Sequence, residues 1–205
     1  MLKRREKTEV RKKQIVDAAR KLIVKRGSEH LTIRGLAKEV GISEAAIYRH
    51  FKSKRDILSF LADDLAVNLL NDLGSLEGNR VTSLNSIEDA LKTHFSSIEQ
   101  RKGMTFQVLA EIISFGDKKL NRQVTRNIQQ YISCLEELLS NGVKAGFVRD
   151  DIELENVALL LFGMIQGMVN IWALSGYDFD LTEKYSSLWG VFRQAIQSTS
   201  GRKKG

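Results

Sequence analysis

The sequence predicts an all-α protein, because apolar residues recur at helical spacing in every long segment and no segment alternates with a period of two. Short, capped segments dominate up to residue 56, and longer ones follow. The predicted layout is therefore a domain of three short helices at residues 1–56, a connecting helix at 57–73 and a larger helical domain at 74–205.

Two short helices joined by a tight turn are encoded by residues 31–51, which read LTIRGLAKEVGISEAAIYRHF. Thr32 is placed to cap the first helix, Gly41 to end it and Ser43 to cap the second. The apolar face of the first helix is formed by Ile33, Leu36, Ala37 and Val40. Helix, glycine turn and helix is the arrangement that lays a recognition helix in the DNA major groove.

The second helix is predicted to present polar chemistry outward. At 100° per residue, Ile47 lies on its inner side, while Ala45, Tyr48 and Arg49 lie opposite and can approach base edges and phosphates. His50 lies toward the buried flank, where a hydrogen-bonded core role and a phosphate contact are both open. Directly afterwards, Ser53 is predicted to cap another helix with Asp56, and Lys54 sits where a helix N-terminus and a cation both attract phosphate.

These residues carry a family resemblance. Residues 32–58 follow T-x-R-x-L-A-x-E-V-G-x-S-x-x-x-I-Y-R-H-F-x-S-K-x-x-[IL]-L, which resembles the DNA-binding signature of the TetR family of bacterial transcriptional regulators, TetR/AcrR type. The resemblance implies base contacts near Arg34, Ala45 and Ala46, and phosphate contacts for Thr32, Tyr48, His50 and Lys54. Glu44 is a possible specificity element. The predicted DNA-binding residues are Thr32, Arg34, Ser43, Glu44, Ala45, Ala46, Tyr48, Arg49, His50 and Lys54.

Charge supports a polyanionic partner for the N-terminal domain. The 205-residue chain has a net charge of +7, but residues 1–56 hold 17 Lys and Arg against 7 Asp and Glu, a balance of +10. Residues 57–205 hold 15 against 18, a balance of −3. Only the first block is therefore expected to face DNA, although a solvated basic surface would look the same.

The single cysteine, Cys134, fits a reducing cytosol, and we expect a cytoplasmic protein.

The remaining helices follow from apolar spacing and caps. We expect an opening helix at residues 8–27, a long fourth helix from Ser53 to Gly74, and a domain boundary in the Gly, Ser and Asn-rich residues 74–85. Ser86, with Asp89 three residues on, is predicted to cap the next helix. Further helices are expected at residues 104–115 and 121–144.

Residues 157–174 contain no charged residue and allow two interpretations. A membrane span is one, but Gln166 and Asn170 near the middle favour the centre of a soluble bundle. Gly163 and Gly167 permit close helix approach, and resemblance to the TetR family implies a four-helix dimer interface made by the last two long helices. The predicted interface residues are Gly163, Gly167, Trp189, Phe192 and Ile196, and the predicted partner is a second copy of this chain.

An enzyme is not expected, because the chain has no nucleophile elbow, P-loop or metal-ligand spacing. No catalytic residue, metal site or cofactor is predicted. Apolar helices with scattered polar groups describe either an ordinary core or a small-molecule site, and family resemblance favours the latter. The candidate ligand-binding residues are His94, Phe95, Phe106, Leu109, Ile113, Tyr131, Phe162, Gln166 and Trp172.

The resulting hypothesis is a ligand-responsive repressor that binds a palindromic operator in double-stranded DNA as a homodimer and is released by a small, largely apolar effector. Two alternatives remain open at this point. One is a nucleoid-associated or cell-division factor that uses the same DNA-binding domain, and the other is a small-molecule enzyme on an all-helical scaffold.

Overall fold

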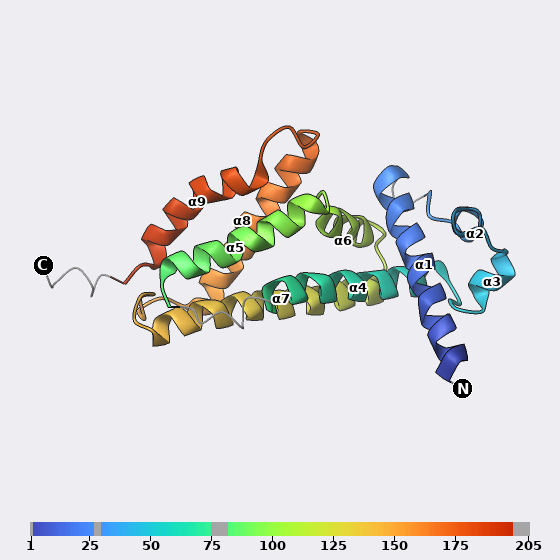
Figure 1. Ribbon diagram of the computed structural model, residues 1–205, viewed down its shortest axis with the longest axis horizontal. Helices are drawn as coiled ribbons and strands as arrows, with labels where there is room; N and C mark the ends of the chain where they lie inside the picture. The colour runs from blue at the N-terminus through green and yellow to red at the C-terminus, as the bar shows by residue number, and fades with distance from the viewer. Residues whose placement is uncertain (1, 27–29, 75–81, 199–205) are drawn as a thin grey trace, which may run out of the picture. The chain divides into compact units, whose positions relative to one another are not determined.

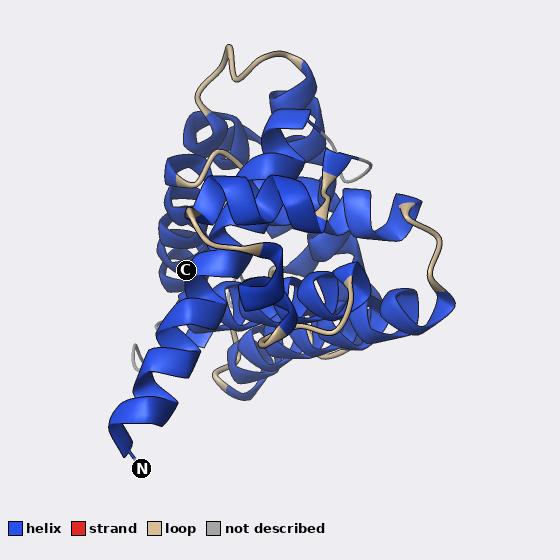
Figure 2. Ribbon diagram, turned by 90° about the vertical axis from the view of Figure 1, so that its right-hand side faces the viewer, coloured by secondary structure: helices blue, strands red, loops and turns tan. Residues whose placement is uncertain are grey.

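The computed structural model describes residues 2–26, 30–74 and 82–198, and in this part of the chain every regular element is a helix (Figures 1 and 2). The predicted all-α class is thereby confirmed. The helices are α1 Leu2–Arg26, α2 Ile33–Val40, α3 Glu44–Tyr48, α4 Lys54–Gly74, α5 Leu84–Gln100, α6 Met104–Ser114, α7 Lys118–Lys144, α8 Leu154–Leu174 and α9 Leu181–Ile196.

The chain forms two compact units. Unit 1 comprises Met1–Ala66 and Gln107–Asn127, and unit 2 comprises Val67–Phe106 and Ile128–Gly205. Unit 1 thus contains the predicted helix-turn-helix, the first part of α4, and the segment that ends α6 and begins α7. The predicted boundary at residues 74–85 falls largely on residues 75–81, which lie outside the described residues.

Unit 1 has a core built on α1. Its apolar face buries Ile15, Ala19 and Ile23, as the periodicity predicts. The helix begins at Leu2, six residues before the predicted start, and its predicted stop, Gly27, lies outside the described residues. An edge-to-face contact between Phe51 and Phe60, with ring centroids 5.8 Å apart, extends this core onto α4.

Polar contacts fix the first half of α4 within unit 1. Arg20 of α1 donates to Asp64 at 2.6 Å. From α7, Gln123 accepts a hydrogen bond from the Ser59 hydroxyl at 2.7 Å and donates to Asp63 at 2.7 Å. The start of α4 is therefore held by side chains from two other helices and not only by its own backbone.

Unit 2 is organised by α5, which packs along α9 (Figure 1). The rings of Phe95 and Tyr185 stack between them with centroids 4.4 Å apart. The start of α5 corrects a prediction: Ser83, not Ser86, is the N-cap. Ser86 instead completes a capping box, because each serine hydroxyl accepts the backbone N–H of the other, at 3.1 and 3.2 Å.

Candidate nucleic-acid interface and effector pocket

The turn between α2 and α3 has the local geometry that its residues predict. The Thr32 hydroxyl accepts from the Gly35 N–H at 2.9 Å, which satisfies a free donor at the start of α2. Gly41 ends α2 in the left-handed region, at φ +73°, where a side chain would be strained. Ser43 then caps α3 by accepting from the Ala46 N–H at 3.2 Å. Both helix starts are therefore fixed by side chains within the motif.

Helix α3 separates an inner face from an outer one within five residues. Ile47 is fully buried, whereas the Tyr48 side chain is 53% exposed. Arg49 follows as the C-cap, so the regular helix is shorter than the sequence pattern suggests. The short helix therefore offers the tyrosine ring and the following guanidinium to solvent while Ile47 anchors it in the core.

Most of the predicted DNA-binding residues lie on the surface of unit 1. The exposed members are Thr32, Arg34, Ser43, Glu44, Ala45, Tyr48 and Arg49. The half-buried members are Ala46, His50 and Lys54. The structure thus leaves seven of the ten predicted side chains open to a partner.

His50 is oriented partly inward. Its Nδ1 atom is buried without a hydrogen-bond partner among the described residues. Burial lowers the pKa of His50 below 6.5, and Arg49, Lys12 and Arg11 lower it further. The imidazole is therefore neutral at pH 7, and only its other nitrogen is available to a phosphate.

Lys54 lies at the start of α4, where the predicted cap is present. The Ser53 hydroxyl accepts from the Asp56 N–H at 3.1 Å, and the Asp56 carboxylate accepts from the Lys52 N–H at 3.0 Å. The Lys54 ammonium lies over the Phe115 ring, 4.9 Å from its centroid. A cation at a helix N-terminus is in this way held in place by an aromatic ring of the same unit.

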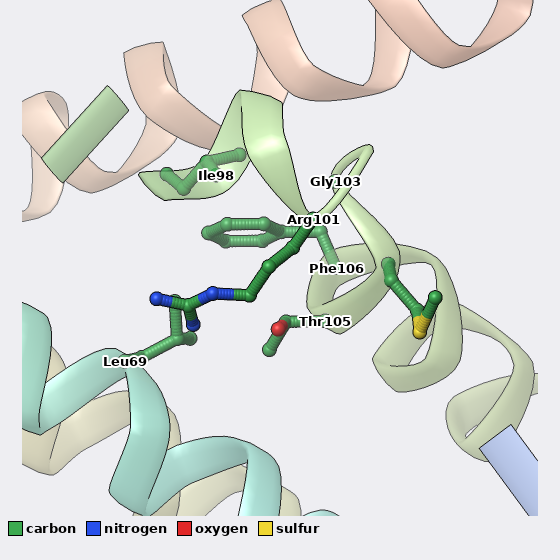
Figure 3. Close-up of a pocket in the computed structure, with 7 residues that line it drawn as sticks. Leu69, Ile98, Arg101, Gly103, Thr105 and Phe106 are labelled. Carbon is green, nitrogen blue, oxygen red and sulfur yellow. The ribbon is translucent and has the colours of Figure 1, made fainter. Parts of the chain in front are cut away.

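Unit 2 contains a small pocket with one charged lining residue. About 170 Å³ of empty space lies among Leu69, Ile98, Arg101, Gly103, Met104, Thr105 and Phe106. Figure 3 shows the Arg101 side chain extending toward Leu69 on α4, with the Phe106 ring and the Thr105 hydroxyl on either side of it. The Nη2 atom of Arg101 donates to both carboxylate oxygens of Asp72, at 2.5 and 2.6 Å. The lining side chains leave no enclosed room for a small molecule, so this pocket is closed in the structure.

A buried polar pair lies beyond the carboxylate of Asp72. Nε2 of His94 and the Tyr131 hydroxyl are 2.6 Å apart, and both side chains are buried. Burial and the charge of Arg101 lower the pKa of His94 from 6.5 to about 3. Burial raises the pKa of Tyr131, so both groups are neutral at pH 7. Nδ1 of His94 lies 3.9 Å from the Asp72 carboxylate, too far for a hydrogen bond.

The structure brings only some of the predicted ligand-binding residues together: the Tyr131 ring lies 5.7 Å from the His94 ring and 5.8 Å from the Phe162 ring, measured between centroids. Only Phe106 lines the pocket. His94, Phe95, Tyr131 and Trp172 are buried in the core of unit 2. Phe162 and Gln166 are half-buried on α8, while Leu109 and Ile113 belong to unit 1, and the Ile113 side chain is 49% exposed.

The sequence interpretation missed Arg101 and Asp72. They stand 29 residues apart on different helices, and no local pattern connects them. The one available signal is the run Arg101, Lys102 and Gly103, a basic turn between two helices in which Lys102 and Gly103 both have positive φ. Within the described residues, no group of His, Cys, Asp and Glu is arranged to hold a metal ion.

The predicted interface residues differ in their surroundings: the two glycines of α8 have open space beside them, whereas the aromatic and aliphatic residues of α9 are buried. A Cβ added at Gly163 or Gly167 would meet nothing within 4 Å. Trp189, Phe192 and Ile196 instead fill the core of unit 2.

Helix α8 is also the one described helix that is long and apolar enough to cross a membrane, which is weak evidence for a span.

Family comparisons agree with this geometry over most of the chain. A profile described as bacterial regulatory proteins of the tetR family matches residues 15–59, and one described as the C-terminal region of YsiA-like proteins matches residues 69–195. The chain belongs to the TetR family. The first match covers the helix-turn-helix, and the second covers the pocket and helices α5 to α9 except the last residue of α9.

Relatives in the TetR family align along almost the whole chain. The fatty acid metabolism regulator protein of Bacillus subtilis is 22% identical over 185 residues, 90% of this chain and 95% of that protein. The nucleoid occlusion factor SlmA of Vibrio vulnificus is 23% identical over 188 residues, 91% of this chain and 96% of that protein. The crystal structure of Bacillus subtilis FadR in complex with stearoyl-CoA has a TM-score of 0.76 and 21% identity, covering 89% of this chain and 98% of that one.

The family assignment fixes the general activity. This TetR-family chain is a DNA-binding transcription regulator. Regulators of the TetR family bind DNA as dimers and bind small molecules. In unit 1, the face of α3 that carries Tyr48 is exposed, and residues 1–56 have a charge balance of +10.

Proposed function

We propose that this regulator is a cytoplasmic repressor that binds a palindromic operator as a homodimer and is released by a small, largely apolar effector. The observation that carries the proposal is the exposed outer face of α3 in a segment with a balance of +10. Tyr48 and Arg49 stand on this face, and Lys54 stands at a helix start where phosphate is favoured. Each of these side chains can then bind either a phosphate of the DNA backbone or the edge of a base.

The dimer interface is proposed from an uncharged stripe on α8. Leu160, Gly163, Gly167, Ile171 and Leu174 recur every three or four residues and are open to solvent apart from Gly167, which is half-buried. On α9, Val191 is 69% exposed, and Gly190 beside it has open space. A continuous apolar stripe of this kind is normally covered by a partner. A second copy fits, because two DNA-binding heads must meet half-sites spaced by turns of the duplex.

The class of effector is proposed from the pocket and from one relative. The pocket walls are mostly apolar, and the relative FadR was solved in complex with stearoyl-CoA. We therefore propose a molecule with an alkyl or acyl chain as the effector of this protein. Binding releases DNA only to the extent that the effector prefers the conformation with low DNA affinity.

A binding series on cognate and scrambled operator duplexes tests the DNA contacts. Tyr48→Ala and Lys54→Ala should weaken binding to both duplexes by a similar factor, because phosphate contacts carry no sequence information. Arg34→Ala and Arg49→Ala should in addition reduce the preference for the cognate duplex, by about 1–3 kcal/mol for each lost base contact. Equal losses for all four variants on both duplexes would refute the assignment.

Chromosome-wide occupancy tests the repressor role. A local repressor occupies a few promoters, and deleting it raises transcription of the adjacent genes. Many dispersed sites without a change in nearby transcription would contradict the proposed role.

The Leu160→Glu variant tests the dimer interface. It places a charge on the proposed interface, and it should convert the dimer to monomer in analytical ultracentrifugation.

A further inference from the structure

The pocket of unit 2 is lined by the Arg101 guanidinium, which is held by the Asp72 carboxylate. We propose that Arg101 binds the negatively charged end of the effector, with Asp72 as the internal competitor that the effector partly displaces. The inference rests on the proposed function, since it requires an effector that binds unit 2. It goes further by stating the charge of the ligand and the residues that select it.

Arg101 has unused binding capacity. Its side chain is 39% exposed, and both bonds to Asp72 use the Nη2 nitrogen. Nη1 and Nε are not committed to this carboxylate. A guanidinium presents its donors in a planar fork that matches a carboxylate or a phosphate, so an incoming anion has donors to engage.

The rest of the lining selects an amphiphile. Leu69, Ile98 and Phe106 supply apolar surface, and Thr105 supplies a hydroxyl beside the guanidinium (Figure 3). A ligand with an alkyl chain and one anionic end would place each part against matching chemistry. A carboxylate or the phosphates of an acyl carrier would serve equally at Arg101, and the experiment below distinguishes them.

The ion pair also keeps the pocket closed. It joins α4 to the end of α5 across a hollow that has no enclosed room for a chain-bearing ligand. The effector therefore enters only as these walls part. Loosening the Arg101 to Asp72 bond is the step that both opens the pocket and frees the cation.

His94 can donate a further hydrogen bond to Asp72 when Arg101 turns to the effector. The Asp72 side chain is only 15% exposed, so a new hydrogen bond to its carboxylate would favour effector binding. Nδ1 of His94 lies 3.9 Å from Asp72 and has no hydrogen-bond partner among the described residues. With the Tyr131 hydroxyl donating to Nε2, the neutral ring carries its proton on Nδ1 and can donate it to Asp72 after a small approach.

Calorimetric titration of the full-length protein tests the inference, with dodecanoate, dodecan-1-ol of the same chain length, and stearoyl-CoA as probes. The native protein should bind dodecanoate at least about tenfold more tightly than the alcohol, as expected for a hydrogen-bonded charge. Arg101→Gln should abolish this difference without weakening the binding of the alcohol, because the variant loses the cation and also the bond that keeps the pocket closed. Asp72→Asn should tighten dodecanoate binding several-fold, because the competing charge is gone.

Glu88→Gln is the matched control. It removes a carboxylate that pairs with Lys92 at 2.9 Å on α5, away from the pocket, and should change no affinity. Retained DNA binding by each variant shows that it is folded. An effect of Arg101→Gln on stearoyl-CoA but not on dodecanoate supports the inference and assigns the anion to the carrier phosphates.

Two results overturn the inference in different ways. If dodecanoate and the alcohol bind equally and Arg101→Gln alters the binding of no probe, an apolar effector remains but its anionic end is refuted. If none of the three probes binds the native protein or releases it from DNA, the proposed effector class fails, and this inference fails with it.

Discussion

The buried histidine of unit 2 should make the protein sensitive to mild acid. Burial holds the pKa of His94 at about 3, against 6.5 in the unfolded chain. The unfolded state therefore takes up a proton as the pH falls through 6.5, whereas the folded state does not until about pH 3. The contribution to stability is complete above pH 6.5 and is lost progressively below it, by about 2 kcal/mol at pH 5.

Urea unfolding at pH 7.5 and pH 5.0 measures this loss, at one protein concentration because dimerisation is linked to folding. His94→Gln removes the titrating group and keeps an amide near Tyr131. The variant should lose about 2 kcal/mol less than the wild type between the two pH values. His30→Gln, which removes an exposed imidazole of unit 1, should behave like the wild type. An equal loss in wild type and His94→Gln would refute the reasoning.

Thermal denaturation of four further variants tests two features of unit 2, a glycine with positive φ and the cap of α5. Gly103→Ala should cost about 2–4 kcal/mol, because φ is +60° and the new Cβ would lie 2.7 Å from Val169 Cγ1. Gly176→Ala, at φ +75° with open space, should cost only about 1 kcal/mol of strain. Equal losses of stability in the Gly103 and Gly176 variants would contradict this account. Ser83→Ala should cost about 1 kcal/mol, because the cap of α5 is lost. Thr93→Ala removes an exposed hydroxyl within α5 and should cost a few tenths of a kcal/mol. A larger loss of stability for Thr93→Ala than for Ser83→Ala would count against the cap.

Local capping explains why the helix-turn-helix was predictable from sequence. The caps at Thr32 and Ser43 are decided within three residues, and both hydrogen bonds are present. The same reasoning misplaced the start of α5, because Ser83 and Ser86 are three residues apart and either serine satisfies the pattern. Only the observed capping box, in which both hydroxyls are used, selects Ser83.

The pocket at Arg101 was not predictable, because its determinants are non-local. Phe95 and Phe106 have the same apolar character in the sequence, and both are buried in the core of unit 2, yet only Phe106 also lines the pocket. The Arg101 to Asp72 bond depends on how α4 packs against the end of α5, which periodicity does not encode. Similarly, periodicity identified Trp189 as apolar but could not show that it faces inward.

The central claim is that the basic N-terminal segment with its exposed α3 face reads duplex DNA. The most direct test selects binding sites from fragmented genomic DNA with the purified protein and then measures the affinity for the selected duplex and a shuffled one across a salt series. The account predicts at least about 10³-fold tighter binding to the selected duplex, and binding to both should weaken steeply as salt rises. Equal affinity for both duplexes, or no binding to either at low salt, would contradict it.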